Sequence, residues 1–100
     1  MESKQSFDKA KKKYLKTLEQ YVAVVARVHG KSHPEFYEVQ KVFDRMVEKI
    51  KGAKKELPEL GQEFDSLRRI TENYNVPEEV CESYEAVYQM LEELDRAYHK

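Results

Sequence analysis

The chain has 100 residues, 37% of them charged and 11% aromatic, with a formal net charge of −1. This balance excludes a disordered tail and a disulfide scaffold, and it lacks the strongly basic footprint of a nucleic-acid binder. No apolar run approaches the roughly 18 residues of a membrane span, and no leader-like segment opens the chain. The single cysteine, Cys81, fits a reducing cytoplasm, so we expect one cytoplasmic domain.

The first helix is predicted over about residues 6–29. Its large apolar residues recur at steps of three and four, which places them on one face of a helix. Ser6 is the predicted N-cap, and Gly30 is expected to stop the helix. The apolar face comprises Phe7, Tyr14, Leu18, Tyr21, Val25 and Val28.

The second helix is predicted over about residues 34–56. Ser32 with Glu35 three residues later forms a capping-box pattern, and Pro34 suits a first helical turn. Gly52 weakens the helix near its end, where we expect fraying or a bend. Its apolar face comprises Phe36, Val39, Phe43, Met46, Ile50, Ala53 and Leu57.

The third and fourth helices are predicted over about residues 58–74 and 77–99. Pro58 marks the boundary before the third, and Pro77 is expected in the first turn of the fourth. The apolar face of the fourth comprises Val80, Tyr84, Val87, Leu91, Leu94 and Tyr98. Because the connections are short, neighbouring helices should be antiparallel. We therefore predict an all-α, up-down-up-down four-helix bundle over residues 1–100.

Surface features leave two alternatives open. The first helix carries a group of lysines, and the fourth carries a group of acids at the same end of the bundle. The lysines are Lys9, Lys11, Lys12, Lys13 and Lys16, and the acids are Glu92, Glu93 and Asp95. The two groups are either solvated faces with weak mutual attraction, or the lysines form a polybasic patch for an acidic partner. Four apolar side chains lie beside the main apolar faces of their helices. They form either a surface for a partner or a second copy, or contacts at the flanks of the bundle. They are Val24, Tyr37, Val42 and Tyr88.

Two strings combine polar, turn and core positions in a specific way. The first is Val28-His29-Gly30-x-x-His33-Pro34-Glu35. The second is Glu63-Phe64-Asp65-x-Leu67-Arg68-Arg69-Ile70-Thr71-x-x-Tyr74-x-x-Pro77-x-x-x-Cys81-x-x-Tyr84. Through them the chain resembles the di-iron iron–sulfur cluster repair proteins, whose main domain is a hemerythrin-like four-helix bundle. The resemblance covers essentially the whole chain, in a shortened form without the family's amino-terminal cysteine-containing domain.

The resemblance also implies where iron ligands belong, at one end of the bundle. The matching positions here are Asp8, about Ala53 and Leu57, Phe64 in place of a histidine, and a pair that would follow Lys100. Geometry agrees, because Phe7, Ala53, Leu57, Phe64 and Tyr98 should share that end as an apolar plug. Asp8 and His99 are the nearby candidates of suitable chemistry. We therefore predict that most metal ligands are lost and that no metal site remains.

Other candidates gather at the opposite end. His29 and His33 can approach Cys81, and two imidazoles with a thiolate are a zinc-type donor set. The alternative is two loop-edge histidines and a half-buried thiol, because the spacing of His29 and His33 across Gly30 and Pro34 is not helical. Cys81 as a nucleophile is opposed by the glutamates around it. His99 reads most simply as a favourable charge at a helix C-terminus.

The sequence thus predicts a non-enzymatic, metal-free helical interaction or structural module that needs no cofactor. Its partner would be a protein or a second copy, not nucleic acid or membrane. The alternative is an iron-binding protein in iron–sulfur cluster repair or in the nitrosative or oxidative stress response. A zinc site at His29, His33 and Cys81 is a third hypothesis.

Overall fold

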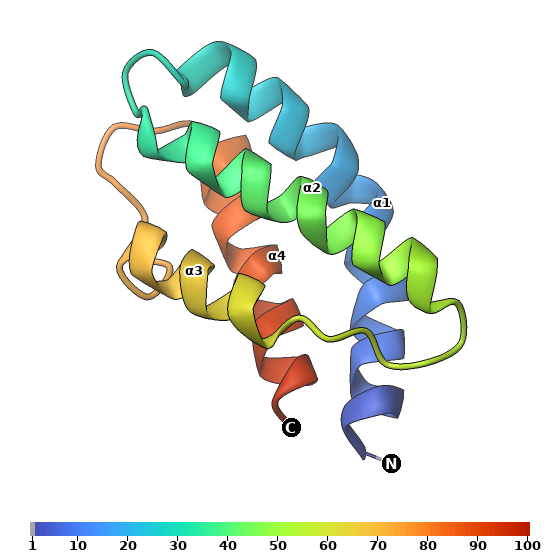
Figure 1. The fold of residues 1–100 in the computed structure, drawn as a ribbon. Coiled ribbons are helices and arrows are strands. Elements are labelled where there is room, and N and C mark those ends of the chain that lie inside the picture. Colours follow the sequence, from blue (N-terminus) through green and yellow to red (C-terminus); the bar gives the residue numbers. More distant parts are fainter. Residues whose placement is uncertain (1) are drawn as a thin grey trace.

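The computed structural model describes residues 2–100, with side chains from residue 4 onward. Over this range the chain forms four helices and no strand: α1 (Glu2–His29), α2 (Glu35–Ala53), α3 (Gly61–Thr71) and α4 (Glu82–Tyr98). The helices alternate in direction along the chain, up, down, up and down (Figure 1). The predicted all-α four-helix bundle is confirmed.

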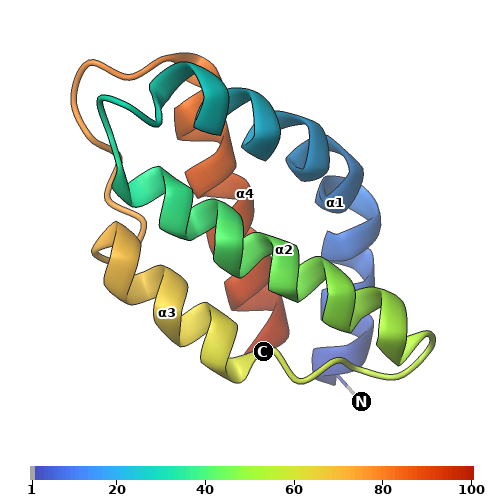
Figure 2. The ribbon, with the colours of Figure 1, turned by 45° about the horizontal axis from the view of Figure 1, so that its top comes forward.

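The helices pack through the apolar faces that their sequences present. α1 lies along α4, and α2 lies against both α1 and α3, as two views show (Figures 1 and 2). Each helix contributes buried side chains to one core, and each fully buried large side chain stabilises the fold by about 1.5–3 kcal/mol. The largest fully buried side chains are Phe7, Leu18, Phe36, Phe43, Met46, Leu60, Phe64, Leu67, Tyr84, Tyr88, Leu91 and Leu94.

The starts of the first two helices differ from the prediction. α1 already begins at Glu2, so Ser6 lies inside the helix and is not its N-cap. Pro34 occupies the N-cap position of α2, and no side chain caps that helix. The capping box of Ser32 is absent because the Glu35 carboxylate lies instead 3.3 Å from His33 Nδ1 and accepts a 3.4 Å hydrogen bond from the Tyr84 hydroxyl.

The second half of the bundle has shorter helices than predicted. α3 begins at Gly61 and ends at Thr71, and α4 begins at Glu82, so Pro77 lies in the connection. Three successive residues after α3, at positions 72–74, have φ between 52° and 62°, a left-handed turn that ends the helix. The Tyr74 amide donates to Thr71 Oγ1 at 2.8 Å, and its hydroxyl donates to Asp95 at 2.6 Å. These bonds hold the turn against the strain of non-glycine residues in this region.

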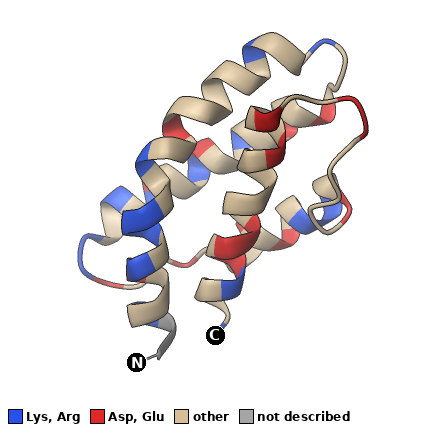
Figure 3. Ribbon diagram, turned by 180° about the vertical axis from the view of Figure 1, so that it is seen from behind, with Lys and Arg blue, Asp and Glu red and all other residues tan. Residues whose placement is uncertain are grey.

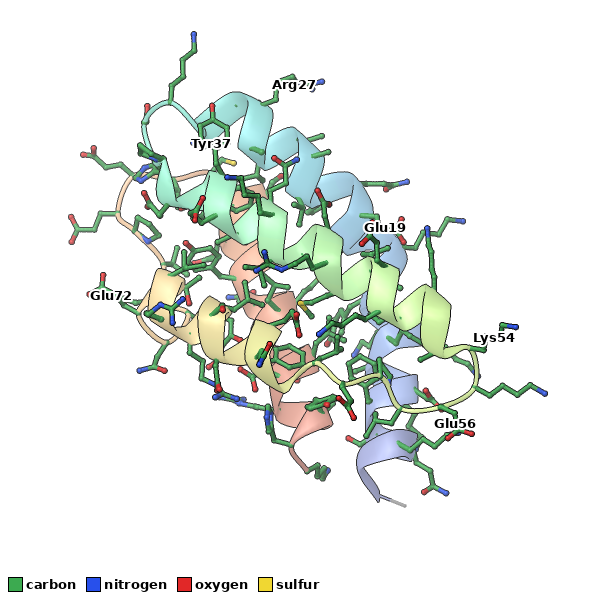
Figure 4. All side chains as sticks on the ribbon, in the orientation of Figure 1. Glu19, Arg27, Tyr37, Lys54, Glu56 and Glu72 are labelled. Atoms are coloured by element: carbon green, nitrogen blue, oxygen red, sulfur yellow. The ribbon has the colours of Figure 1, made fainter. Side chains whose placement is uncertain are left out.

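Gly30 directly follows α1, and the packing around it leaves no space for a side chain. Its φ is not positive, so it does not form the left-handed cap that was expected. A Cβ at Gly30 would collide with the Tyr37 ring and with the Ala26 carbonyl oxygen. Tyr37 therefore packs across the turn between α1 and α2 only because residue 30 has no side chain (Figure 4).

Substitution by alanine should change the stability of the protein in opposite directions at Gly30 and at Gly52. Gly52 lies inside α2, and a methyl group added there would meet nothing within 4 Å, so Gly52→Ala should raise the free energy of unfolding by about 0.5–1 kcal/mol. Gly30→Ala should lower it, because the Tyr37 ring must be displaced. Urea unfolding of the two variants beside the parent checks both signs, and equal effects would contradict the packing described for Gly30.

Candidate functional site

The end of the bundle where the resemblance places iron is filled by aromatic rings. Phe7 and Phe64 are fully buried, and their ring centroids lie 5.6 and 5.3 Å from that of Tyr98. The Tyr98 hydroxyl donates to the Pro58 carbonyl at 3.0 Å and accepts from the Leu60 amide at 2.9 Å. The one oxygen of this cluster is therefore committed to the backbone, and the predicted apolar plug is confirmed for these three rings.

The two polar candidates of this end have separate partners. Asp8 lies 3.7 Å from Lys4 and 3.7 Å from Lys11 on the outside of α1. His99 caps the C-terminus of α4, as its charge preference predicted, and its Nδ1 lies 2.8 Å from Asp95. Neither the Asp8 carboxylate nor the His99 imidazole is presented to the space between the helices as a metal ligand.

A buried ion-pair network was missed by sequence reasoning, which had counted Asp95 among the surface acids. Asp95 is only 5% exposed, and Arg68 donates to both of its oxygens, from Nε at 2.9 Å and from Nη2 at 2.7 Å. The Tyr74 hydroxyl adds a third hydrogen bond at 2.6 Å. Arg68 and Tyr74 both belong to the second quoted string, and these two regularly placed polar residues were the available signal.

The charges of this network are mutually stabilised. Burial alone would raise the pKa of Asp95, but the hydrogen bonds from Arg68 and Tyr74 outweigh it and hold the pKa below its usual value. The hydrogen bond to Asp95 likewise raises the pKa of Arg68, while burial is the main cause of the raised pKa of Tyr74. Because Asp95 is saturated by donors, it acts as an anchor between α3 and α4, not as a base or an open ligand.

A second polar anchor joins α2 to α3 at the same end. Glu63 is 5% exposed, and the Lys49 ammonium lies 2.9 and 3.0 Å from its two oxygens. Lys49 also donates to the Glu59 carbonyl at 3.1 Å. Both carboxylates buried near the expected iron level are thus neutralised by cations of this chain.

The opposite end brings the remaining candidates together. The His33 amide donates to the His29 carbonyl at 2.8 Å in a turn that follows the end of α1, so the two histidines do not lie on one helix, as predicted. Both imidazole rings then pack edge-on against Tyr84, at centroid distances of 5.6 and 5.4 Å. His29 Nε2 lies 3.0 Å from Cys81 Sγ, although 52 residues separate them.

The tyrosines beneath this cluster extend it into the core. The hydroxyls of Tyr84 and Tyr88 lie 3.2 Å apart, and burial raises the pKa of both phenols. Tyr88 and Val42 are only 1% and 3% exposed, so they belong to the core and not to a partner surface. Val24 and Tyr37, the other two off-seam residues, are each 42% exposed.

Neither end assembles a metal-binding set in this arrangement. Among the side chains that the structure describes, from residue 4 onward, no three or more of His, Cys, Asp or Glu are grouped so that they could hold an ion. His33 is directed to Glu35, while His29 is directed to Cys81. A search for spanning segments over the same residues finds no helix with the length and apolar character needed to cross a membrane.

Three curated bacterial proteins are similar to the chain. A protein of Staphylococcus epidermidis strain RP62A is 27% identical over 120 aligned residues, covering 89% of this chain and 54% of the relative. A protein of strain ATCC 12228 matches to the same extent. One of Staphylococcus haemolyticus strain JCSC1435 is 26% identical over 116 residues, covering 85% of the chain and 52% of the relative. All three are named "Iron-sulfur cluster repair protein ScdA".

The chain is thus similar, at low identity, to proteins named for iron–sulfur cluster repair. This agrees with the resemblance that its strings carry. The chain spans about half the length of these relatives. No protein-family model matches it, and no solved structure matches it either.

Proposed function

We propose that the chain is a hemerythrin-like bundle that has exchanged a di-iron centre for an aromatic core. It acts in the cytoplasm as a non-enzymatic binding module associated with iron–sulfur cluster repair. The observation that carries the proposal is the packing of Phe7, Phe64 and Tyr98 at the level where the resemblance requires ligands. The link to repair is supported by the names of the relatives.

The donor chemistry at that level does not fit two irons. A di-iron bundle uses several carboxylates and imidazoles that converge from facing helices. Here Phe64 stands where the resemblance has a histidine, and the two nearby buried carboxylates, Glu63 and Asp95, are held by Lys49 and Arg68. Neither buried carboxylate therefore needs a metal to balance its charge, which is the arrangement expected of a bundle that folds without metal.

The second candidate function is iron binding in cluster repair, and the relatives' names favour it. It requires ligands from outside residues 1–100 or from a second subunit, since Asp8 and His99 already have partners within the chain. The two candidates predict opposite outcomes of iron loading.

Iron loading under anaerobic conditions tests the proposal. We expect that purified protein, supplied with ferrous iron and then desalted, keeps less than stoichiometric iron. We also expect the same melting temperature with and without chelator, because a structural metal would contribute folding free energy. Two irons retained per chain, with an oxo-bridge absorption band once the desalted protein is oxidised by air, would overturn the proposal in favour of the second candidate.

The same metal analysis separates the zinc hypothesis. Stoichiometric zinc that disappears in His29→Ala would place a metal at the end of the bundle that holds Cys81. His99→Ala is the matched control, because His99 lies at the other end beside Asp95. Zinc that is absent from the parent, or retained in His29→Ala, would exclude that site.

A further inference from the structure

A groove between α1 and the C-terminal part of α2 is lined by cations from both helices. Its volume is about 540 Å³, which is in the range of ligand-binding clefts. The half-buried Leu15 and the buried Ile50 belong to the lining and form an apolar floor. The charged residues of the lining are Lys11, Lys12 and Lys16 on α1, Lys51 on α2, Lys54 directly after α2, and one carboxylate, Glu19.

Most of this positive charge has no counter-charge in the part of the chain that the structure describes. Among the described side chains, Lys11 has a carboxylate within ion-pair distance, that of Asp8 at 3.7 Å. The other four lysines of the groove have none, and Glu19 pairs with no described cation. Lys12 and Lys16 also lie four residues apart on α1, where like charges repel each other. A bound anion would relieve this repulsion, so the groove favours an anionic occupant.

The groove between α1 and α4 also carries cations, but they are committed to other groups. The Arg96 guanidinium lies 3.4 Å from the Glu92 carboxylate and 3.6 Å from that of Glu93. The Lys13 ammonium lies over the Tyr14 ring, 5.2 Å from its centroid. Figure 3 shows the acidic bands of α4 on this side of α1, and basic bands in the turn after α2 on the other side. Uncompensated positive charge is therefore concentrated between α1 and α2.

We propose that the α1/α2 groove binds a short acidic segment of a partner protein, in which carboxylates alternate with large apolar side chains. The lysines pair with the carboxylates of the segment, and Leu15 and Ile50 contact its apolar side chains. This inference rests on the proposed function in treating the bundle as a binding module, and it adds the chemistry of the partner.

The surroundings of the groove favour a short segment over a nucleic acid or a membrane. Glu19 also lines the next groove along α1 and α2, where the other charged residues are Asp44 and Glu48. A nucleic-acid duplex, with one charge about every 1.7 Å, would extend over these carboxylates and be repelled by them. An anionic membrane surface would meet the same carboxylates. A segment that ends near Glu19 avoids this repulsion.

Fluorescence anisotropy of a labelled peptide of Glu-Glu-Leu repeats, in buffer with chelator and at low salt, tests the proposal. We expect saturable binding that weakens as the salt concentration is raised, because salt screens exposed charges. A peptide of Gln-Gln-Leu repeats of the same length should not bind measurably. Absence of binding by the acidic peptide would overturn the proposal, as would equal binding of the two peptides.

Charge reversal tests the position of the site. Lys12→Glu combined with Lys51→Glu should weaken peptide binding at least about tenfold, since both changes replace a cation of the groove by an anion. Lys9→Glu combined with Lys13→Glu is the matched control: it changes the net charge equally, but in the α1/α4 groove, and should weaken binding clearly less. All four lysines are exposed, so the far-ultraviolet circular dichroism of both variants should match the parent. Equal weakening by the two double variants would contradict the assignment of the groove.

Other occupants of the groove are tested with the same variants. Tighter binding of polyphosphate, of a single-stranded oligonucleotide or of phosphatidylserine vesicles than of the acidic peptide would overturn the choice of a protein segment. A dimer in sedimentation velocity that is abolished by Lys12→Glu with Lys51→Glu would assign the groove to a second copy of the chain, and would overturn that choice as well.

The outcome for the peptide and the outcome for iron are distinguishable. The peptide experiments contain no iron, so a protein that binds no acidic peptide would defeat this inference and leave the iron-loading result untouched. A protein that binds two irons would defeat the proposed function whether or not the peptide binds.

Discussion

Phe64→Ala is expected to lower the free energy of unfolding by about 3–5 kcal/mol, with or without chelator. Phe64 is fully buried, and its ring centroid lies 5.3 Å from that of Tyr98, so the substitution opens a cavity in the aromatic cluster. Urea unfolding with and without chelator measures the loss. Under the proposed function the loss should be the same with and without chelator, because the rings of Phe7, Phe64 and Tyr98 pack together at this end of the bundle.

Leu57→Ala provides the control for this prediction. Leu57 packs against the same core but is only partly buried, so its truncation should cost clearly less than that of Phe64. A loss for Phe64→Ala that depends on chelator would contradict the account of an aromatic core without metal. So would equal losses for the two variants.

Asp95→Asn should lower the free energy of unfolding by about 2–4 kcal/mol. The substitution keeps the size of the side chain but removes the charge that accepts two hydrogen bonds from Arg68 and one from Tyr74. Arg68 is partly exposed, so water screens part of its unpaired charge and limits the loss. Glu93→Gln, which removes an exposed carboxylate from the same helix, should change stability little.

The pH dependence of stability provides a second readout of Asp95. Its pKa is lower in the folded protein than in the unfolded chain, where it lies near ~4. Its contribution to stability is therefore fully present above pH ~4, and it is lost as the pH falls through the folded-state value. The parent should lose stability more steeply than Asp95→Asn on acidification below pH ~4. Parallel pH profiles for the two proteins would contradict the ion-pair network.

The periodic apolar residues of the sequence were sufficient to predict that four helices form, and the short connections predicted their directions, although several helix bounds differ from the prediction. Steps of three and four place Tyr84, Val87, Leu91 and Leu94 on one face whatever the neighbouring helix is, and all four are buried. The same pattern predicted that Phe7, Phe64 and Tyr98 meet at one end. Burial of large apolar side chains depends mainly on local periodicity and helix length, which are properties of a continuous segment.

Polar pairings were beyond this reasoning, because they depend on which helices become neighbours and at what height. In the sequence, Asp95 looked like its neighbours Glu92 and Glu93, but α3 places Arg68, 27 residues away in the chain, against it. The left-handed turn after α3 is held by the bond from the Tyr74 hydroxyl to that same carboxylate, and α4 begins only at Glu82.

Local sequence was also a poor guide to which flank of a helix is covered by a neighbouring helix. Tyr88 and Val42 lie off the main seams and yet are buried, whereas Val24 and Val28 on α1 stay exposed. The approach of His29 to Cys81, in contrast, was predicted, because the two connections lie at the same end of the bundle, and the structure places His29 Nε2 3.0 Å from Cys81 Sγ. Hydrophobic periodicity acts within one helix and is readable along the chain. Which flanks and polar groups are covered is settled only when four helices pack, because each contact then joins residues that the chain itself keeps far apart.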